Sequence, residues 1–254
     1  MEQKWPQQLW LVRHGQSAGN VARDAAEAAA RQNIELATRD VDVPLSALGL
    51  RQAHALSGWF AAMAPAQRPN VVLYSPYLRA VATAQAVLEQ LDRPSLLAAL
   101  ADERLREKEF GITDRLTPLG IREKFPELAV QRSSVGKFYF RPPGGESWCD
   151  VILRLRSVLD TITREYRADR VLIIGHQVIV NCFRYLLERM DEATILAIDR
   201  AGDVPNCGVT SYGFDPAAGK QGKLVLQQAN FVAPLQDSGT PVTVQPDRPA
   251  APKP

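Results

Sequence analysis

Short apolar runs alternate with longer segments of helical periodicity along most of the chain. The apolar runs have the length of buried strands and stand at residues 9–12 (LWLV), 71–74 (VVLY) and 171–174 (VLII). Helical spacing of apolar residues follows them at residues 19–32, 46–63, 78–90, 146–167 and in a segment after His176. This alternation is typical of a parallel α/β sheet that is covered by helices.

The remaining segments complete the predicted organisation. Residues 208–214 and 224–228 predict strands that close the sheet, at least one of them at an edge. Residues 102–145 are rich in Pro, Gly and charge, which predicts an irregular excursion from the sheet. Residues 232–254 are rich in proline and lack apolar periodicity, so we expect a tail that lies along the surface or is disordered. The predicted domain is residues 1–231, with the excursion inside it and the tail after it.

The composition fits one large globular domain and excludes several classes of protein. The 254 residues are 46% hydrophobic and 23% charged, with a formal net charge of +2. A nucleic-acid-binding domain would carry a clearer basic excess, and no apolar run reaches the roughly 18 residues that span a bilayer. The first residues lack the pattern of a signal peptide, and three widely spaced cysteines suit reduced thiols. We therefore expect a cytoplasmic protein with no nucleic-acid or membrane partner, either a monomer or a homodimer.

Polar side chains stand directly after three of the predicted strands. Arg13 and His14 follow the run LWLV, and His176 follows the run VLII after one glycine. Arg79 lies in the first turn of the helix that follows VVLY. Since ligands bind outside the carboxyl ends of the strands in an open parallel sheet, we expect these four side chains to form one site.

Two histidines and two arginines at that edge suit phosphoryl transfer. Guanidinium groups present a planar fork of donors to phosphate oxygens, and helix N-termini also favour an anion. A neutral imidazole can attack phosphorus, and a second imidazole can neutralise the charge on the equatorial oxygens. The chain has no Gly-rich loop ending in Lys-Ser/Thr, no CxxC and no HExxH. Neither nucleoside triphosphate hydrolysis nor zincin chemistry is therefore indicated.

Seven segments resemble, in the same order, the motifs of one family. They read LVRHGQSAGN, VDVPLSALGLRQAHAL, YSPYLRAVATA, LREKEFG, PPGGES, IIGH and NCGVTSYGF. In this pattern the chain is similar to the phosphoglycerate-mutase-like branch of the histidine phosphatase superfamily over about residues 9–230. The resemblance implies a three-layer α/β/α sandwich with a mostly parallel central sheet.

The resemblance also implies roles for single residues. His14 matches the nucleophile that becomes a phosphohistidine, and Arg13, Arg79 and His176 match groups that bind the transferred phosphoryl group, with His176 also catalytic. Asn20 matches a residue near the phosphate pocket. A small phosphorylated substrate is the expected partner, and neither a metal ion nor another cofactor is implied.

Two carboxylates compete for the role of general acid or base. Glu107 lies four residues before Gly111, where the family keeps this group. Glu103 lies in the same loop but too far upstream of the glycine to match the pattern. The sequence therefore favours Glu107, which would protonate the leaving alkoxide.

The excursion also contains the residues that we expect to select the substrate. Residues 128–145 hold three basic side chains, Arg132, Lys137 and Arg141, and the aromatic trio 138–140. As a lid, this stretch can hold a second anionic group of the substrate or stack on a ring. Alternatively, the aromatic side chains only anchor the loop and the bases are solvated. The sequence leaves both interpretations open.

Four functions remain to be compared. A phosphatase that hydrolyses phosphomonoesters is favoured over a phosphoglycerate mutase, because the segment from Gly111 to Gly144 is short and does not resemble the mutase insertion. A catalytically silent binding protein is disfavoured by the complete set of candidate site residues. A metallohydrolase is disfavoured because the neighbouring arginines would repel a metal ion.

Overall fold

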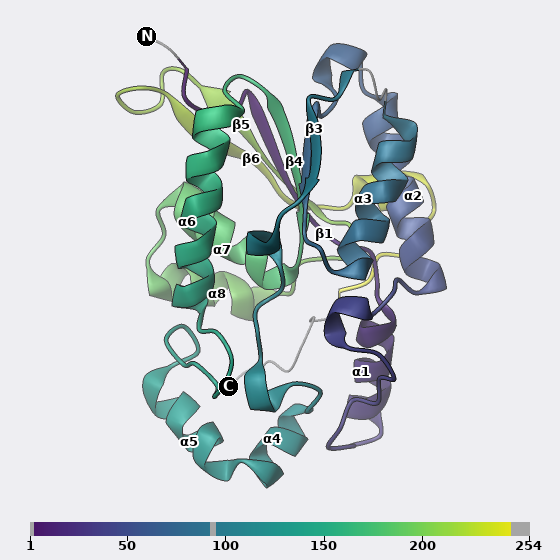
Figure 1. The fold of residues 1–254 in the computed structure, drawn as a ribbon, viewed down its shortest axis with the longest axis vertical. Coiled ribbons are helices and arrows are strands. Elements are labelled where there is room, and N and C mark those ends of the chain that lie inside the picture. Colours follow the sequence, from purple (N-terminus) through teal and green to yellow (C-terminus); the bar gives the residue numbers. More distant parts are fainter. Residues whose placement is uncertain (1–2, 92–94, 245–254) are drawn as a thin grey trace.

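A six-stranded sheet forms the middle layer of a three-layer α/β/α sandwich (Figure 1). The computed structural model describes residues 3–91 and 95–244. The strands are β1 (Gln8–Arg13), β2 (Val71–Tyr74), β3 (Ala98–Ala101), β4 (Arg170–Gly175), β5 (Val209–Asp215) and β6 (Lys223–Phe231). Their order is β3-β2-β4-β1-β5-β6, and the first four are mutually parallel. β5 pairs antiparallel with β1, and β6 pairs antiparallel with β5.

Helices cover both faces of this sheet and one of its ends. The α-helices are α1 (Ala18–Ala28), α2 (Ala47–Ala62), α3 (Leu78–Gln90), α4 (Pro118–Lys124), α5 (Pro126–Val135), α6 (Trp148–Glu165), α7 (Gln177–Glu188), α8 (Glu192–Ala201) and α9 (Ala233–Asp237). Short 3-10 helices are η1 (Asp40–Asp42), η2 (Pro65–Gln67), η4 (Glu103–Leu105) and η5 (Gly111–Thr113). None of the helices in the described part of the chain is long and apolar enough to cross a membrane.

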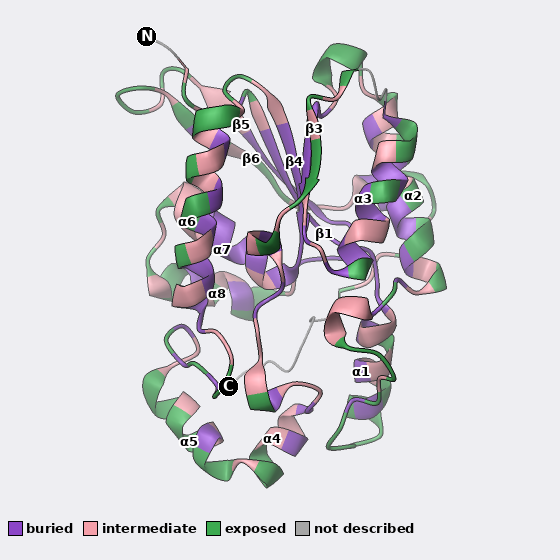
Figure 2. Cartoon of the chain, viewed as in Figure 1, coloured by how far each residue is buried: buried purple, intermediate pink, exposed green. Residues whose placement is uncertain are grey.

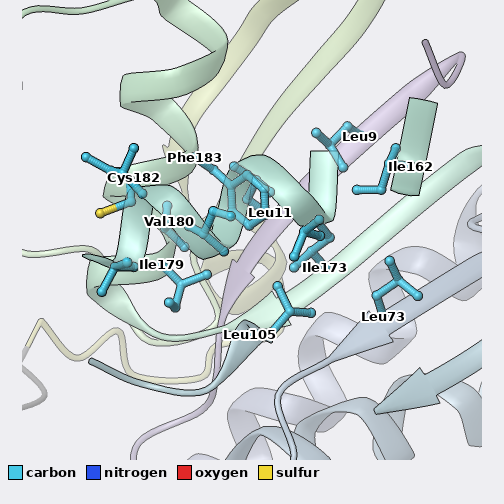
Figure 3. Close-up of a cluster of buried hydrophobic side chains, with 14 of the residues drawn as sticks. Leu9, Leu11, Leu73, Leu105, Ile162, Ile173, Ile179, Val180, Cys182 and Phe183 are labelled. Carbon is cyan, nitrogen blue, oxygen red and sulfur yellow. The ribbon is translucent and has the colours of Figure 1, made fainter. Parts of the chain in front are cut away.

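Alternate residues of the central strands are buried in two different hydrophobic cores. Leu9 and Leu11 of β1 belong to a cluster that includes α6 and α7, and Figure 3 shows this packing. Trp10 and Val12 belong to a second cluster with α2 and α3 on the opposite face. This alternation follows from the two-residue repeat of a strand. Because both faces are buried, the strands read as continuous apolar runs in the sequence, and Figure 2 shows their central parts as buried.

The helix α6 illustrates how the sequence specifies one of these layers. Ser147 caps its first turn by accepting from the backbone of Asp150, whose side chain accepts in return from the Ser147 backbone, which forms a capping box. The side chains that it buries recur at helical spacing and are Trp148, Val151, Ile152, Leu155, Val158 and Ile162. Burying each large apolar side chain contributes roughly 1.5–3 kcal/mol, so this stripe fixes the helix against the sheet.

The excursion is more regular than its composition predicts. The interpretation of residues 102–145 as irregular is wrong in part, because this segment contains the helices α4 and α5. Pro118 and Pro126 stand in the first turns of these two helices, where a proline lacks only a donor that would be unused anyway. The same prolines read as loop signals in the sequence. Figure 1 shows α4, α5 and α1 beyond one end of the sheet.

The segment after β6 packs on the body as far as it is described. α9 buries the side chain of Leu235 in the core that contains α2. Farther on, the backbone carbonyl of Pro241 and the hydroxyl of Thr243 both accept hydrogen bonds from Gln52 of α2. Residues 245–254 of the predicted tail lie outside the described residues, and the predicted domain boundary near residue 231 stays a prediction.

Candidate active site

The parallel pairing of β1 with β4 brings the two histidines together. Arg13 at the end of β1 is in register with Gly175 at the end of β4. The backbone N–H of His14 then donates to the Gly175 carbonyl oxygen at 3.0 Å. The imidazole of His14 lies 5.1 Å from that of His176, measured between ring centroids. The sequence prediction that these strand ends form one site is thus matched by their geometry.

Two glycines allow the first turn of α2 to approach the backbone next to His14. A Cβ atom on Gly49 would lie 1.9 Å from the carbonyl oxygen of Gln16, and one on Gly15 would lie 2.5 Å from that of Gly49. Such distances are far below van der Waals contact, so these positions require glycine. The close approach lets the side chain of Gln52 on α2 accept a hydrogen bond from the Gln16 backbone at 2.8 Å.

The partners of the His14 ring define its tautomer. Its Nδ1 lies 2.6 Å from the backbone carbonyl oxygen of Gly15, which can only accept, so Nδ1 carries the proton. The Nε of Arg79 donates to His14 Nε2 at 3.2 Å, which requires a lone pair on Nε2. His14 is fully buried. The ring is therefore a neutral imidazole with its basic nitrogen beside a guanidinium, as a nucleophile toward phosphorus needs.

Arg79 links the histidine to an acidic residue that the sequence analysis did not select. The Nη1 and Nη2 groups of Arg79 donate to the two carboxylate oxygens of Asp40, at 3.2 and 3.3 Å. Nη1 also donates to the backbone carbonyl of Asp40 at 2.8 Å. Arg79 is only 3% exposed, so this ion pair is partly shielded from water. A phosphate that approaches Arg79 meets the negative charge of Asp40 on the same guanidinium.

His176 and Glu107 close the opposite side of the site. The Nε2 of His176 is hydrogen-bonded to the hydroxyl of Ser75 at 2.8 Å, and the ring of Tyr77 stands edge-on at 5.3 Å. The Nδ1 of His176 lies 3.8 Å from Glu107 Oε2. Both His176 and Glu107 are fully buried. Burial, with Glu109 and Glu107 nearby, raises the pKa of Tyr77, so that its phenol stays protonated.

The two candidate acids lie in different environments. Glu107 faces His176, and its Oε1 accepts from the backbone N–H of Lys108 at 2.7 Å. Glu103 begins the 3-10 helix η4 and is exposed. A proton donor must lie within reach of the leaving oxygen, so the geometry favours Glu107 for this role.

Arg13 is the last residue of β1, and Asn20 lies in the first turn of α1. Arg13 is fully buried, and its Nη1 donates to the backbone carbonyl of Val204 at 2.5 Å. Asn20 forms a capping box with Ser17 at the start of α1, in which its Oδ1 accepts from the Ser17 backbone at 2.9 Å. The role of Asn20 near a phosphate pocket stays a prediction.

Ser75 and Asp40 are polar residues of the site that the sequence analysis missed. Ser75 follows β2 directly, like the other strand-end residues. Asp40 gives no such signal, because its loop reaches Arg79 only through the fold.

A pocket opens on the Arg79 side of the site. Its lining combines apolar and charged side chains, namely Ser17, Gly19, Ile34, Leu36, Asp40, Val43, Arg79, Asp114 and Arg115. Burial raises the pKa of Asp114, and this carboxyl group faces the pocket with Asp40. Arg115 donates to the backbone carbonyls of Leu36 and Thr38, at 3.0 and 2.6 Å, and so braces the pocket wall.

The three basic residues predicted to select the substrate have different surroundings. Lys137 forms an ion pair with Asp199, and Arg141 forms one with Asp150 at the start of α6. Arg141 has a side chain that is 62% exposed. Arg132 lies on α5, near Asp199 and Lys108. Ion pairs thus occupy Lys137 and Arg141, so the three bases do not form one free cluster.

The aromatic trio anchors the loop rather than lining a free surface. Phe138 and Phe140 are 4% and 8% exposed, while Tyr139 is 55% exposed. Phe138 packs against Trp148 and Tyr185, with ring centroids 6.2 and 5.5 Å away. The interpretation that the aromatic side chains anchor the loop is therefore confirmed for Phe138 and Phe140.

The fold and the site together define a class of proteins: α/β sandwiches with a pair of histidines and arginine side chains at the carboxyl edge of the sheet. A family model described as the histidine phosphatase superfamily (branch 1) matches residues 9–225. The chain belongs to this superfamily.

Relatives in the superfamily include both mutases and phosphatases. The chain is 28% identical over 201 residues to a 2,3-bisphosphoglycerate-dependent phosphoglycerate mutase of Methylobacterium sp. (strain 4-46), covering 78% of this chain and 88% of the mutase. It is 30% identical over 178 residues to a 6-phosphofructo-2-kinase/fructose-2,6-bisphosphatase of Caenorhabditis elegans, covering 70% of this chain and 33% of that protein.

Solved structures show the same fold. A mycobacterial glucosyl-3-phosphoglycerate phosphatase in complex with inorganic phosphate is similar with a TM-score of 0.66 and 22% identity, covering 90% of this chain and 99% of that one. A putative alpha-ribazole-5'-P phosphatase from Escherichia coli is similar with a TM-score of 0.68 and 18% identity, covering 89% and 98%. At these identities the likeness supports the fold alone.

The ion pair between Arg79 and Asp40 leads to a prediction about anion affinity. The substitution Asp40→Asn removes a negative charge from the guanidinium that faces an incoming phosphate. We expect the dissociation constants of inorganic phosphate and vanadate to fall about 3- to 10-fold, as a partly buried charge at this range contributes on the order of 1 kcal/mol. Isothermal titration calorimetry or inhibition of turnover measures this change.

The matched control is Asp42→Asn. Asp42 lies in the same 3-10 helix, but its carboxylate is 46% exposed and pairs with the exposed Arg39. We expect this variant to bind phosphate like the wild type. Weaker phosphate binding in Asp40→Asn would show instead that the main contribution of Asp40 is to hold Arg79 in place.

Proposed function

We propose that the protein is a phosphatase that hydrolyses phosphomonoesters through a covalent phosphohistidine at His14. The observation that carries this proposal is the state of the His14 ring. Its Nδ1 is held by the Gly15 carbonyl oxygen at 2.6 Å, and its basic Nε2 faces Arg79 at 3.2 Å. A nucleophile and a phosphate-binding group thus meet at one point at the end of β1.

In the first step, His14 Nε2 forms a bond to phosphorus while the bond from phosphorus to the ester oxygen breaks. Glu107 gives its proton to the leaving alkoxide, and the alcohol departs. Arg13, Arg79 and His176 neutralise the charge on the equatorial oxygens of the transferred group. Asn20 adds a neutral donor to the same group.

In the second step, a water molecule attacks the phosphorus of phosphohistidine. The bond between phosphorus and Nε2 breaks, and the ionised Glu107 accepts the proton that the water loses. Inorganic phosphate leaves, and both His14 and Glu107 return to their starting protonation states. Each step uses side chains of this chain only.

The runner-up function within the same chemistry is a phosphoglycerate mutase, which returns the phosphoryl group to a hydroxyl of the substrate. The short connection from η5 to α6, made of the helices α4 and α5 and their loops, supports the phosphatase. The compact segment contains no long insertion that would retain a sugar acid during two transfers. The two activities differ in product, since only the phosphatase releases inorganic phosphate.

A metallohydrolase is not favoured by the donor set. Within the part of the chain that the structure describes, no group of three or more His, Cys, Asp or Glu side chains is arranged to hold a metal ion. The two histidines stand beside Arg79 instead, whose charge opposes a cation. The proposed enzyme acts on a small phosphorylated substrate, and its three free cysteines support a reducing, cytoplasmic location.

The nucleophile assignment predicts the behaviour of His14→Ala. Brief incubation of the wild type with a labelled phosphoester should leave acid-labile, base-stable phosphate on His14, which peptide mass spectrometry locates. His14→Ala should lose this label and at least about 99% of kcat, since a covalent route has no substitute nucleophile at this site. Inorganic phosphate release measures the turnover.

His54→Ala is the control, because His54 is the third histidine of the chain and lies exposed on α2. It should keep wild-type activity and labelling. Activity of His14→Ala above about a tenth of the wild type would refute the nucleophile assignment. Labelling of the wild type without release of inorganic phosphate would favour the mutase.

The role of Glu107 predicts a dependence on the leaving group. Glu107→Gln cannot donate the proton, so kcat/KM for alkyl phosphates should fall about 100- to 10,000-fold, the usual contribution of general acid catalysis. The fall should be much smaller for p-nitrophenyl phosphate, whose phenolate leaves without a proton. Glu103→Gln is the control and should change neither substrate. If Glu103→Gln showed this dependence and Glu107→Gln did not, the two roles would be exchanged.

A further inference from the structure

We propose that Thr243, in the segment after α9, is a positioning residue for His14. Its hydroxyl joins two buried side-chain amides, those of Gln52 and Asn206, into one chain of hydrogen bonds. The chain begins at the backbone N–H of Gln16 and ends at the carbonyl oxygen of His14. The expected effect on turnover rests on the proposed phosphatase function, whereas the expected effect on the His14 ring does not.

The peptide group between Gly15 and Gln16 determines the state of the His14 ring. Its carbonyl oxygen lies 2.6 Å from His14 Nδ1, and its N–H donates to Gln52 Oε1 at 2.8 Å. A trans peptide group is planar, and its carbonyl and N–H point in opposite directions. A hydrogen bond that fixes the N–H of Gln16 therefore also fixes the direction of the Gly15 carbonyl. Because glycine allows many backbone conformations, this peptide group depends on such bonds.

The preceding peptide group, between His14 and Gly15, is held at both ends as well. The His14 carbonyl oxygen accepts from Asn206 Nδ2 at 3.0 Å. The backbone N–H of Gly15 donates to the hydroxyl of Thr83 at 3.1 Å. Gln52 and Asn206 thus bind two successive peptide groups next to the ring, and both side chains are fully buried.

Backbone partners give the amide of Gln52 a single orientation. Its Oε1 faces the N–H of Gln16, which can only donate, and its Nε2 donates at 2.9 Å to the carbonyl oxygen of Pro241, which can only accept. The other hydrogen of Nε2 is directed to the hydroxyl oxygen of Thr243, also at 2.9 Å. The Thr243 oxygen is therefore an acceptor toward Gln52.

The hydroxyl of Thr243 transmits this orientation to Asn206. A hydroxyl has one proton, and that of Thr243 is donated to Asn206 Oδ1 at 2.9 Å. An amide that accepts on Oδ1 from Thr243 presents its Nδ2 group to the His14 carbonyl oxygen. The reversed amide would place two acceptors against each other inside the protein, which is unfavourable. Thr243 thus selects the Asn206 orientation that stabilises the backbone of His14.

The segment that carries Thr243 is anchored by contacts other than this hydroxyl. The carbonyl oxygen of Thr243 accepts from the backbone N–H of Asn206 at 3.0 Å. Val242 packs against the core that contains Leu56 and Phe60 of α2, and the fully buried Leu235 of α9 belongs to the same core. Removal of the hydroxyl alone should therefore leave the segment in place.

The test replaces Thr243 by two similar residues. Thr243→Val keeps the branched shape but removes the hydroxyl, so that Gln52 Nε2 and Asn206 Oδ1 each lose a partner. We expect kcat to fall about 5- to 10-fold for alkyl and aryl phosphates alike, with KM nearly unchanged, because the nucleophile is less well positioned. Thr243→Ser retains the hydroxyl, and its kcat should stay within about 2-fold of the wild type. Release of inorganic phosphate measures both variants.

Thr240→Val is the matched control, because Thr240 lies in the same segment and its hydroxyl accepts from Ser238. It should have the kcat and KM of the wild type. Melting temperatures and the fraction of molecules that can be labelled as phosphohistidine at long times identify losses that come from unfolding. A loss of kcat that Thr243→Ser shares, or one explained by a smaller labelled fraction, would refute the positioning role. So would a rise in KM without a change in kcat.

Nitrogen-15 NMR of labelled histidine measures the His14 ring without any turnover. The chain has three histidines, and comparison with His14→Ala assigns the His14 signals. The wild type should show the tautomer with the proton on Nδ1, since Nδ1 faces the Gly15 carbonyl oxygen. In Thr243→Val the nitrogen shifts should move toward a mixture of both tautomers, and Thr243→Ser should match the wild type. Unchanged shifts in Thr243→Val would overturn the proposal. A wild type that releases phosphate from no phosphoester would refute only the proposed function, because these shifts would still test Thr243.

A double variant tests whether Thr243 acts through Asn206. Asn206→Ala removes the amide that contacts His14, and its kcat should fall at least as far as that of Thr243→Val. Adding Thr243→Val to Asn206→Ala should lower kcat by less than about a further 2-fold, since two residues that act in one network are not additive. The full 5- to 10-fold loss in this background would show that Thr243 affects the site by another route, and would contradict the assignment.

Discussion

The parallel pairing of β1 with β4 is the interaction on which the site depends. It places Arg13 in register with Gly175 and thereby sets His14 beside His176. Both strands lie in the centre of the sheet and are buried on both faces, so their ends cannot shift without disturbing two cores. The geometry of the two histidines is thus determined by strands that are buried on both faces.

Burying two arginine side chains at the carboxyl edge of the sheet costs free energy, and the surrounding residues reduce this cost. Arg13 and Arg79 are buried with the histidines, and a buried charge is destabilising unless it has partners. Val204 and Asp40 supply such partners through a carbonyl oxygen and a carboxylate. Under the proposed function, a phosphate group is a better partner than either, because it meets several donors at once. Its binding then relieves the electrostatic repulsion among the cations of the site.

The sequence predicted the parts of the fold that depend on local pattern. The strands β1, β2 and β4 could be found because each is a short, continuous apolar run. The two histidines at strand ends could be found because ligands bind at the carboxyl ends of the strands in a parallel α/β sheet. The edge strand β3 and the helix α8 were missed, because half-exposed elements lack a clear apolar pattern. The site residue Asp40 was missed for another reason. Its environment comes from a segment distant in sequence, because it pairs with Arg79 of α3.

The two groups of site residues also differ in the kind of element that holds them. The side chains proposed to bind the phosphoryl group include Arg13, His14 and His176 at the ends of central strands, whereas the proposed acid, Glu107, belongs to the excursion between β3 and α6. Leu105 and Phe138 of the excursion are buried in the core that includes Leu9 and Leu11 of β1. Substitutions in α4 and α5 can therefore change what surrounds the leaving alcohol without moving His14 or His176. Because Glu107 also belongs to the excursion, substitutions that change the surroundings of the leaving alcohol must leave the loop that carries Glu107 in place beside His176.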